Sequence, residues 1–190
     1  MTLLDRDDLE RGLRLLVAEL RRRGRPARVR IIGGAAMALQ YYDRESTRDI
    51  DVAVSMPDSE LEEIASIIAT AEGWASDWLN AAAAKFVPSY GRAVEWVTIH
   101  EEASIVIQIA PPDAMLAMKL RANRPGRDEA DLRVLMAICG RSTLNKLEDL
   151  FEEFYPGDAL SDRAIRLVEA INAQGAPVVP SPPAPVDLTT

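Results

Sequence analysis

The chain has 190 residues, of which 48% are hydrophobic and 27% are charged, and its formal net charge at pH 7 is −8. This composition is ordinary for a globular protein with one sizeable core, and no apolar run approaches the roughly 20 residues that a membrane span needs. The negative charge argues against indiscriminate nucleic-acid binding by the whole surface, although a local basic patch is compatible with it.

Rare residues limit the chemistry that is available to the chain. Cys139 is the only cysteine, which excludes an internal disulfide and a multi-cysteine zinc site. His100 is the only histidine, and no nucleophile elbow accompanies it. The N-terminus has acids where a secretory signal needs basic residues, and it lacks an apolar h-region. We therefore expect a cytoplasmic protein with no membrane partner.

The first predicted element is an amphipathic helix over Leu3–Arg23, because leucine and valine recur at three- and four-residue steps. A strand over Ala27–Ile32 follows, with Arg28 and Arg30 on one face. Six of the ten residues in Arg21–Arg30 are arginine. Two interpretations remain open, namely a helix end matched to its dipole beside a half-exposed strand, or a phosphate-binding ridge.

The chain then reads as strand, glycine turn, short helix, loop and strand over Ile31–Val54. The pair Gly33 and Gly34 follows an apolar strand and precedes a run with good helix propensity at its start. Glycine lets the backbone approach a ligand closely, and a helix N-terminus attracts anions. This end of the stretch therefore suits a phosphate.

Two acids, Asp49 and Asp51, flank Ile50 in the last strand of this stretch. Because strand side chains alternate between faces, both carboxylates share one face, with Cα atoms about 6.6 Å apart. Adjacent like charges cost free energy unless they are offset, and Mg²⁺ prefers carboxylate oxygens while leaving positions open for phosphate. We therefore predict that Asp49 and Asp51 hold Mg²⁺. The alternative is a buried strand pair with two acids at its rim and a turn glycine.

Further helices and strands are predicted along the rest of the chain. The segments expected to form helices are Pro57–Ala71, Trp74–Ala84, a stretch opened by Pro111-Pro112-Asp113, Arg127–Cys139, Leu144–Tyr155 and Asp158–Ala173. Two strands, Val94–His100 and Ala103–Ile109, are expected around a turn at Glu101 and Glu102. The proline-rich residues 175–190 are predicted to be disordered. We expect a core domain over residues 1–110, a helical region over 111–174 and this tail.

Lys119 lies inside a helix that is apolar around much of its circumference. A long lysine stem can snorkel, so simple surface placement is one interpretation. The other is a lysine that points into a cleft toward a triphosphate.

The ordered set Ile32-Gly33-Gly34, fourteen residues, and Asp49-Ile50-Asp51 resembles the pattern of the nucleotidyltransferase superfamily. The resemblance implies an α+β fold of the polymerase-β-like type, which is a small mixed sheet flanked by helices, here with a C-terminal helical bundle. Thr47 stands two residues before Asp49, as in the superfamily, and joins the glycines as a nucleotide-binding candidate. Arg44 corresponds loosely to an arginine found ahead of the paired acids. A third carboxylate often stands where this chain has Gln108. Either Glu95 or a later acid substitutes for that carboxylate, or Gln108 is a plain polar residue at a strand end.

A second block, from Lys119 to Asp131, is similar to the nucleotidyltransferase toxins of the AbiEii and MenT types. The resemblance implies that Lys119 contacts nucleotide phosphates and that a downstream acid completes the site. Asp131 is favoured over Asp128 for that acid, and Arg127 is a further candidate for contact with the triphosphate.

The implied activity is a Mg²⁺-dependent transfer of a nucleoside monophosphate from a nucleoside triphosphate to an acceptor. The toxin resemblance implies a tRNA 3′ end as the acceptor and a cognate antitoxin as a partner. Two alternatives are open: a catalytically weakened nucleotide-binding or regulatory protein, and a transferase that modifies a small molecule or a protein.

Overall fold

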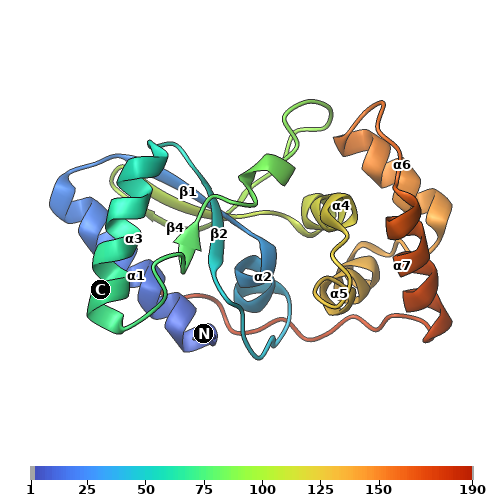
Figure 1. The fold of residues 1–190 in the computed structure, drawn as a ribbon, viewed down its shortest axis with the longest axis horizontal. Coiled ribbons are helices and arrows are strands. Elements are labelled where there is room, and N and C mark those ends of the chain that lie inside the picture. The colour runs from blue at the N-terminus through green and yellow to red at the C-terminus, as the bar shows by residue number, and fades with distance from the viewer. Residues whose placement is uncertain (1–2, 190) are drawn as a thin grey trace. The chain divides into compact units, whose positions relative to one another are not determined.

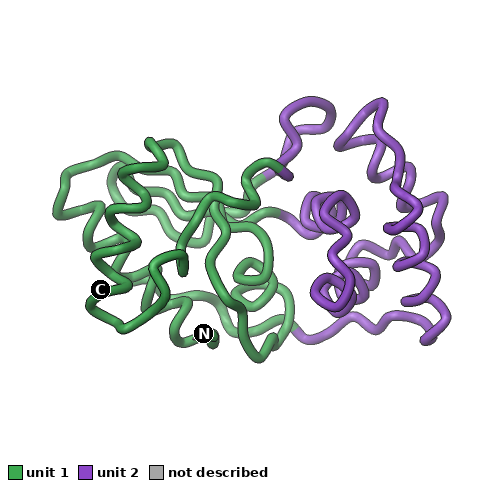
Figure 2. The backbone as a smooth tube through the Cα atoms, viewed as in Figure 1, with its two compact units in different colours: residues 1–85, 96–110, 182–190 green, residues 86–95, 111–181 purple. Residues whose placement is uncertain are grey.

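The structure, a computed structural model, describes residues 3–189 and divides into two compact units (Figure 2). Unit 1 contains the described residues of 1–85, 96–110 and 182–190, and unit 2 contains residues 86–95 and 111–181. We had not expected the short excursion of residues 86–95 into unit 2, nor the return of the C-terminal segment to unit 1.

Unit 1 is built on a five-stranded mixed sheet in the order β3-β2-β1-β5-β4 (Figure 1). Its strands are β1 (Ala27–Ile32), β2 (Ile50–Val54), β3 (Leu79–Asn80), β4 (Val97–Glu102) and β5 (Ile105–Ile109). Strand β1 pairs antiparallel with β2 and parallel with β5, while β3 is parallel to β2 and β4 is antiparallel to β5. The predicted α+β class, a small mixed sheet with flanking helices, is confirmed.

One face of the sheet is the core of unit 1. Val29, Ile31 and Ile107 are fully buried there, and the helices α1 (Arg6–Arg23) and α3 (Asp58–Glu72) pack against one another beside the sheet (Figure 1). The strand register places Arg30, Ala53 and Gln108 on the opposite face, where they are only half-buried. The alternation predicted for β1 and β5 therefore separates an apolar face from a polar one.

Between β1 and β2 the chain forms the short helix α2 (Gly33–Ala36), which continues as a π-helix, η1 (Met37–Tyr41). The hydroxyl of Tyr41 donates a hydrogen bond of 2.5 Å to the carbonyl of Ala110. This bond ties the end of η1 to the residue that follows β5, so the glycine turn is held against the sheet.

The helix that we predicted over Trp74–Ala84 is wrong. This segment contains strand β3, and the 3₁₀-helix η2 spans Ala84–Phe86. Leu79 and Asn80 pair with Ile50 and Asp51 of β2. The Trp78 indole is buried and donates to the carbonyl of Ala65 at 2.9 Å. Tertiary packing thus overrides the helix propensity of the alanines.

Two further predictions need correction. The turn between β4 and β5 falls at Ala103 and Ser104, with Ala103 at φ +51°, so Glu101 and Glu102 belong to β4.

The C-terminal segment, which we predicted to be disordered, has no helix or strand but packs against unit 1. Leu188 is 2% exposed, and Arg6 and Arg14 of α1 donate to the carbonyls of Ala184 and Asp187.

Unit 2 is helical. Its helices are α4 (Pro112–Ala122), α5 (Glu129–Cys139), α6 (Leu144–Phe154) and α7 (Asp162–Ala173). Helix α4 packs on α5 and α6, and α5 packs on α7. Arg92, in the excursion of residues 86–95, forms ion pairs with Asp113 at 2.5 Å and Glu153 at 2.9 Å, which attach the excursion to α4 and α6. Among the helices of residues 3–189, none combines the length and apolar character of a membrane span.

Candidate active site

The glycine turn and the second acid of the predicted site lie against one another. Ile32, the last residue of β1, pairs with Asp51 of β2, and Gly33 follows with φ +71°. A Cβ atom added to Gly33 would lie 2.9 Å from Oδ2 of Asp51. The backbone conformation therefore favours glycine at this position, and a larger residue would displace the carboxylate of Asp51.

Gly34 faces the loop that leads into β2. A Cβ atom added to Gly34 would lie 2.6 Å from Oγ1 of Thr47 and 3.6 Å from Cζ of Arg44. Arg44 donates from Nε to the carbonyl of Ser46 at 3.0 Å and from Nη1 to the hydroxyl of Tyr42 at 3.2 Å. These bonds hold a guanidinium beside the start of α2, where positive charge and backbone amides together suit an anion.

Asp49 lies on the same side of the sheet as Asp51, as the contacts of Asn80 with both residues indicate. Asn80 is the partner of Asp51 in the β2–β3 ladder, so the two side chains share a face. The amide of Asn80 donates to Oδ2 of Asp49 at 3.3 Å. The hydroxyl of Thr47 also donates to the backbone carbonyl of Asp49, at 3.3 Å, which ties the loop to the start of β2.

The position of the expected third carboxylate is occupied by a bridging amide. Oε1 of Gln108 accepts from Nε of Arg30 at 3.3 Å, and Nε2 of Gln108 lies 3.3 Å from Oγ1 of Thr98. In residues 3–189, no group of three or more histidine, cysteine or carboxylate side chains is placed to hold a metal ion. Asp49 and Asp51 supply the hard oxygens that Mg²⁺ prefers, and substrate phosphates and water are its usual remaining ligands. The donor set therefore fits a magnesium ion that is bound together with a phosphate substrate.

Lys119 is paired with carboxylates inside unit 2. Its Nζ lies 2.7 Å from Oδ1 of Asp128 and 2.7 Å from Oδ2 of Asp131, and both carboxylates are fully buried. Lys119 itself is 4% exposed, so the interpretation of a snorkelling surface lysine is wrong. The three residues join α4 to the start of α5, and Arg124 adds a contact to Asp128 at 3.2 Å.

The charges around Asp128 decide its protonation. Burial raises the pKa of this carboxyl group, but the Lys119 ammonium and the hydrogen bonds from Arg124 and Lys119 lower it by more. The net result is a pKa below the ordinary value, which keeps Asp128 ionised in its ion pair with Lys119.

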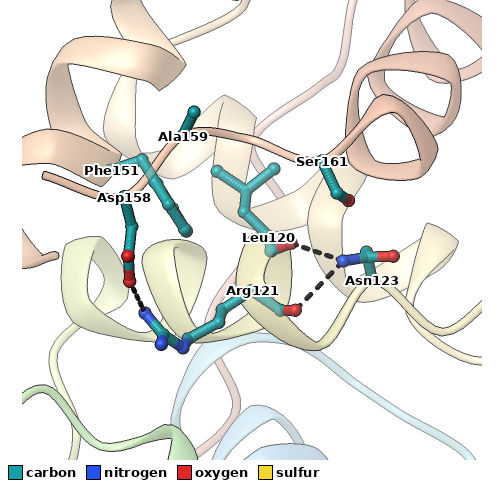
Figure 3. A pocket seen from close by; sticks show the side chains of 7 residues that line it. All are labelled: Leu120, Arg121, Asn123, Phe151, Asp158, Ala159 and Ser161. Carbon is teal, nitrogen blue, oxygen red and sulfur yellow. Dashed lines mark hydrogen bonds and ion pairs between the residues drawn. The ribbon is translucent and has the colours of Figure 1, made fainter.

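Unit 2 also has a pocket of about 280 Å³ (Figure 3). Some residues that line it, such as Leu120, are neighbours of Lys119 in the sequence, but none of the predicted site residues lines it. Its polar groups already have partners. Arg121 and Asp158 form an ion pair at 2.6 Å, and the amide of Asn123 donates to the carbonyls of Leu120 and Arg121. We therefore assign no site to it.

Most arginines of the predicted basic ridge are neutralised. Arg21 pairs with Glu102 and Arg25 with Glu60, at 2.5 and 3.1 Å. Arg22 and Arg23 both contact Glu19, and their hydrogen bonds hold the pKa of that carboxyl group at about 2. These ion pairs favour the interpretation of a structural helix end over that of a continuous phosphate-binding ridge.

The structure thus brings together Gly33, Gly34, Thr47, Asp49 and Asp51 in unit 1. Lys119 and Asp131 are brought together in unit 2. Arg127 is exposed, and among the described residues it forms no ion pair with Asp128 or Asp131. Sequence reasoning missed Asn80 completely, because its segment was read as a helix, and it gave Arg44 only a loose correspondence.

Comparison with known proteins identifies the family of the chain. Residues 12–172 match the family described as "Nucleotidyltransferase of unknown function (DUF6036)". Searches of curated proteins and of solved structures each found no match. The family match covers most of the chain. The chain therefore belongs to the DUF6036 family of nucleotidyltransferases.

Proposed function

We propose that the protein transfers a nucleoside monophosphate from a nucleoside triphosphate to an acceptor hydroxyl, with Asp49 and Asp51 as the metal-binding pair. The observation that carries this proposal is the contact between Gly33 and the carboxylate of Asp51. It combines an anion-binding backbone turn with a metal-binding acid inside one unit. The family match supports the transferase class.

Asp49 and Asp51 are the residues that would hold Mg²⁺, which neutralises triphosphate charge and promotes ionisation of the attacking hydroxyl when bound. Asn80 orients Asp49 through its amide hydrogen bond. The amides of Gly33 and Gly34, with Arg44 beside them, receive the triphosphate. Thr47 fixes the loop that carries Arg44 and Asp49.

The transfer itself is an in-line displacement. The acceptor oxygen forms a bond to the α-phosphorus, the bond from that phosphorus to the bridging oxygen of the β-phosphate breaks, and pyrophosphate leaves. The hydroxyl proton passes to solvent. The protein contributes positioning and electrostatic stabilisation and forms no covalent bond with the substrate.

For Lys119, Asp131 and Arg127, the roles in nucleotide binding and catalysis rest on the sequence resemblance alone. Lys119 donates to two carboxylates, so a contact with triphosphate would use its third ammonium hydrogen or displace one of these bonds. Arg127 is exposed and has no such constraint.

We further propose a tRNA 3′ end as the acceptor, and a role as the toxin of a toxin–antitoxin pair. The similarity of the Lys119–Asp131 block to AbiEii- and MenT-type toxins supports both. The ion pairs along α1 restrict the basic surface that a tRNA can use in unit 1, so contact there would be local.

A second candidate is a nucleotide-binding protein that no longer catalyses transfer. The observation that favours it is Gln108, which occupies the place of a third acid and is bonded to Arg30 and Thr98.

One experiment separates these functions. The pure protein is incubated with each labelled nucleoside triphosphate, Mg²⁺ and total RNA, with a parallel sample containing a chelator. Label in tRNA that depends on Mg²⁺ supports the proposal. Nucleotide binding without pyrophosphate release supports the second candidate, and label in a small product or in a protein rules out the tRNA acceptor.

A further inference from the structure

Two arginines of β1 differ from the neutralised arginines before them. Arg28 and Arg30 lie on the polar face of the sheet, which also carries Asp51 and Ala53. Within residues 3–189, neither arginine has a carboxylate partner at ion-pair distance. The polar face therefore has acids toward one end of β2 and unpaired guanidinium groups farther along the neighbouring strand.

Arg30 is held in place without being neutralised. Its guanidinium lies over the ring of Trp96, with Cζ 4.8 Å from the ring centroid, and Nε donates to Gln108 at 3.3 Å. Burial, and then the positive charge of Arg28, lower the pKa of Arg30. The two guanidinium groups thus repel one another, and an anion between them would relieve that repulsion.

A pocket of about 160 Å³ lies at these two side chains. It is lined by Arg28, Arg30, Ala53, Val54 and Ser55. Ala53 is two residues beyond Asp51 in β2, so the pocket begins roughly 7 Å along the strand from the proposed metal site. Ser55 accepts from the backbone amide of Arg28 at 3.0 Å, which closes that end of the ladder.

We propose that this pocket, the Arg28–Arg30 pocket, binds a backbone phosphate of a single-stranded RNA acceptor. The proposal rests on the proposed transferase function and names the class of its acceptor. Guanidinium groups match phosphate oxygens in geometry and charge. The position suits such an acceptor, because a strand whose hydroxyl lies beside Asp51 can reach this pocket, roughly 7 Å away on the same sheet face, with one of its phosphates.

The ion pairs of the neighbouring arginines restrict phosphate binding on this surface to the Arg28–Arg30 pocket. Arg21, Arg22, Arg23 and Arg25 pair with glutamates, so among the described part of the chain only Arg28 and Arg30 of this arginine-rich stretch lack an ion pair. One backbone phosphate held by both guanidinium groups corresponds to a slope of about −0.7 in log K against log salt concentration.

The test measures binding of a short, labelled single-stranded RNA by fluorescence anisotropy, without nucleoside triphosphate, over a range of salt concentrations. Arg28→Gln and Arg30→Gln are each expected to weaken binding several-fold and to reduce the magnitude of the salt slope, by at most about 0.7. Arg25→Gln is the control, because it removes the same charge from an arginine that is paired with Glu60. Equal affinities in all three variants, or equal losses in all three, would overturn the proposal.

Kinetics separate this inference from the transferase function. In active protein, Arg28→Gln should raise KM for the RNA and leave KM for the nucleoside triphosphate unchanged. The opposite pattern would make the pocket a triphosphate subsite and overturn the acceptor assignment. If the protein transfers nothing to RNA, the transferase proposal fails, while the anisotropy comparison still decides whether the pocket binds RNA.

Discussion

The carboxylate of Asp51 lies so close to Gly33 that a Cβ atom at residue 33 would be 2.9 Å from Oδ2. This relationship joins the end of β1, the start of α2 and the acid of β2 at one point. It explains why the first residue of α2 is a glycine, and it leads to a first prediction.

Gly33→Ala should abolish or strongly reduce transfer. Gly73→Ala is a matched control, because Gly73 has the same φ of +71° but no atom within 4 Å of an added Cβ. Both variants pay roughly 1–2 kcal/mol for the left-handed conformation. Only Gly33→Ala displaces Asp51, so its activity should fall at least tenfold further than that of the control. Equal activities would show that the contact has no functional role.

Asn80→Ala should reduce the transfer rate about 10- to 100-fold and raise the Mg²⁺ concentration needed for half-maximal activity, because Asp49 loses the amide that orients it. Asn172→Ala removes an amide hydrogen bond to the backbone carbonyl of Ser142, in unit 2, and should leave both quantities unchanged. A magnesium titration of activity for both variants makes the comparison. An unchanged magnesium requirement in Asn80→Ala would contradict the orienting role.

Lys119→Met should destabilise unit 2 by about 3–5 kcal/mol, because it leaves two buried carboxylates without their cation. Lys146→Met is the control, since Lys146 is exposed on α6. Urea unfolding followed by circular dichroism measures the difference. If Lys119→Met instead unfolds as the wild type does and only raises KM for the nucleoside triphosphate, Lys119 is a triphosphate ligand rather than a structural one.

Low pH should reduce the stability that the cluster of Lys119, Asp128 and Asp131 gives to unit 2. The pKa of Asp128 is lower in the folded protein than the ordinary value of about 3.9, so its ionisation stabilises the fold above about pH 4. That contribution is lost as the pH falls from there through the lower folded pKa. The difference in free energy of unfolding between the wild type and Asp128→Asn should therefore shrink below pH 4. A difference that stays constant down to pH 2.5 would be inconsistent with a lowered pKa.

Local patterns predicted much of the sheet and of the helices. Strand β1 has the predicted bounds, Ala27–Ile32, and β5 has the predicted alternation, because both depend on residue spacing along one strand. Long-range contacts were harder to predict. Strand β3 depends on pairing with β2 and on burial of Trp78, neither of which is visible in its own alanine-rich sequence.

In the candidate site, too, local patterns could be predicted from the sequence and long-range contacts could not. The paired acids and glycines could be found from their order in the chain. The partners of Lys119 could be proposed only by resemblance, because a buried ion pair between two helices leaves no periodic signal. The ion pairs of Arg21 and Arg25 join residues that are far apart in sequence, so the sequence alone overestimated the basic ridge.

The most direct test of the central claim is pyrophosphate release by Asp51→Asn in the presence of Mg²⁺, each nucleoside triphosphate and RNA. Asp43→Asn, an exposed acid in the loop between η1 and β2, serves as the charge-matched control. We predict that Asp51→Asn loses more than about a hundredfold in rate with an unchanged circular-dichroism spectrum, and that Asp43→Asn retains activity. Wild-type pyrophosphate release by pure Asp51→Asn protein would contradict the proposed active site.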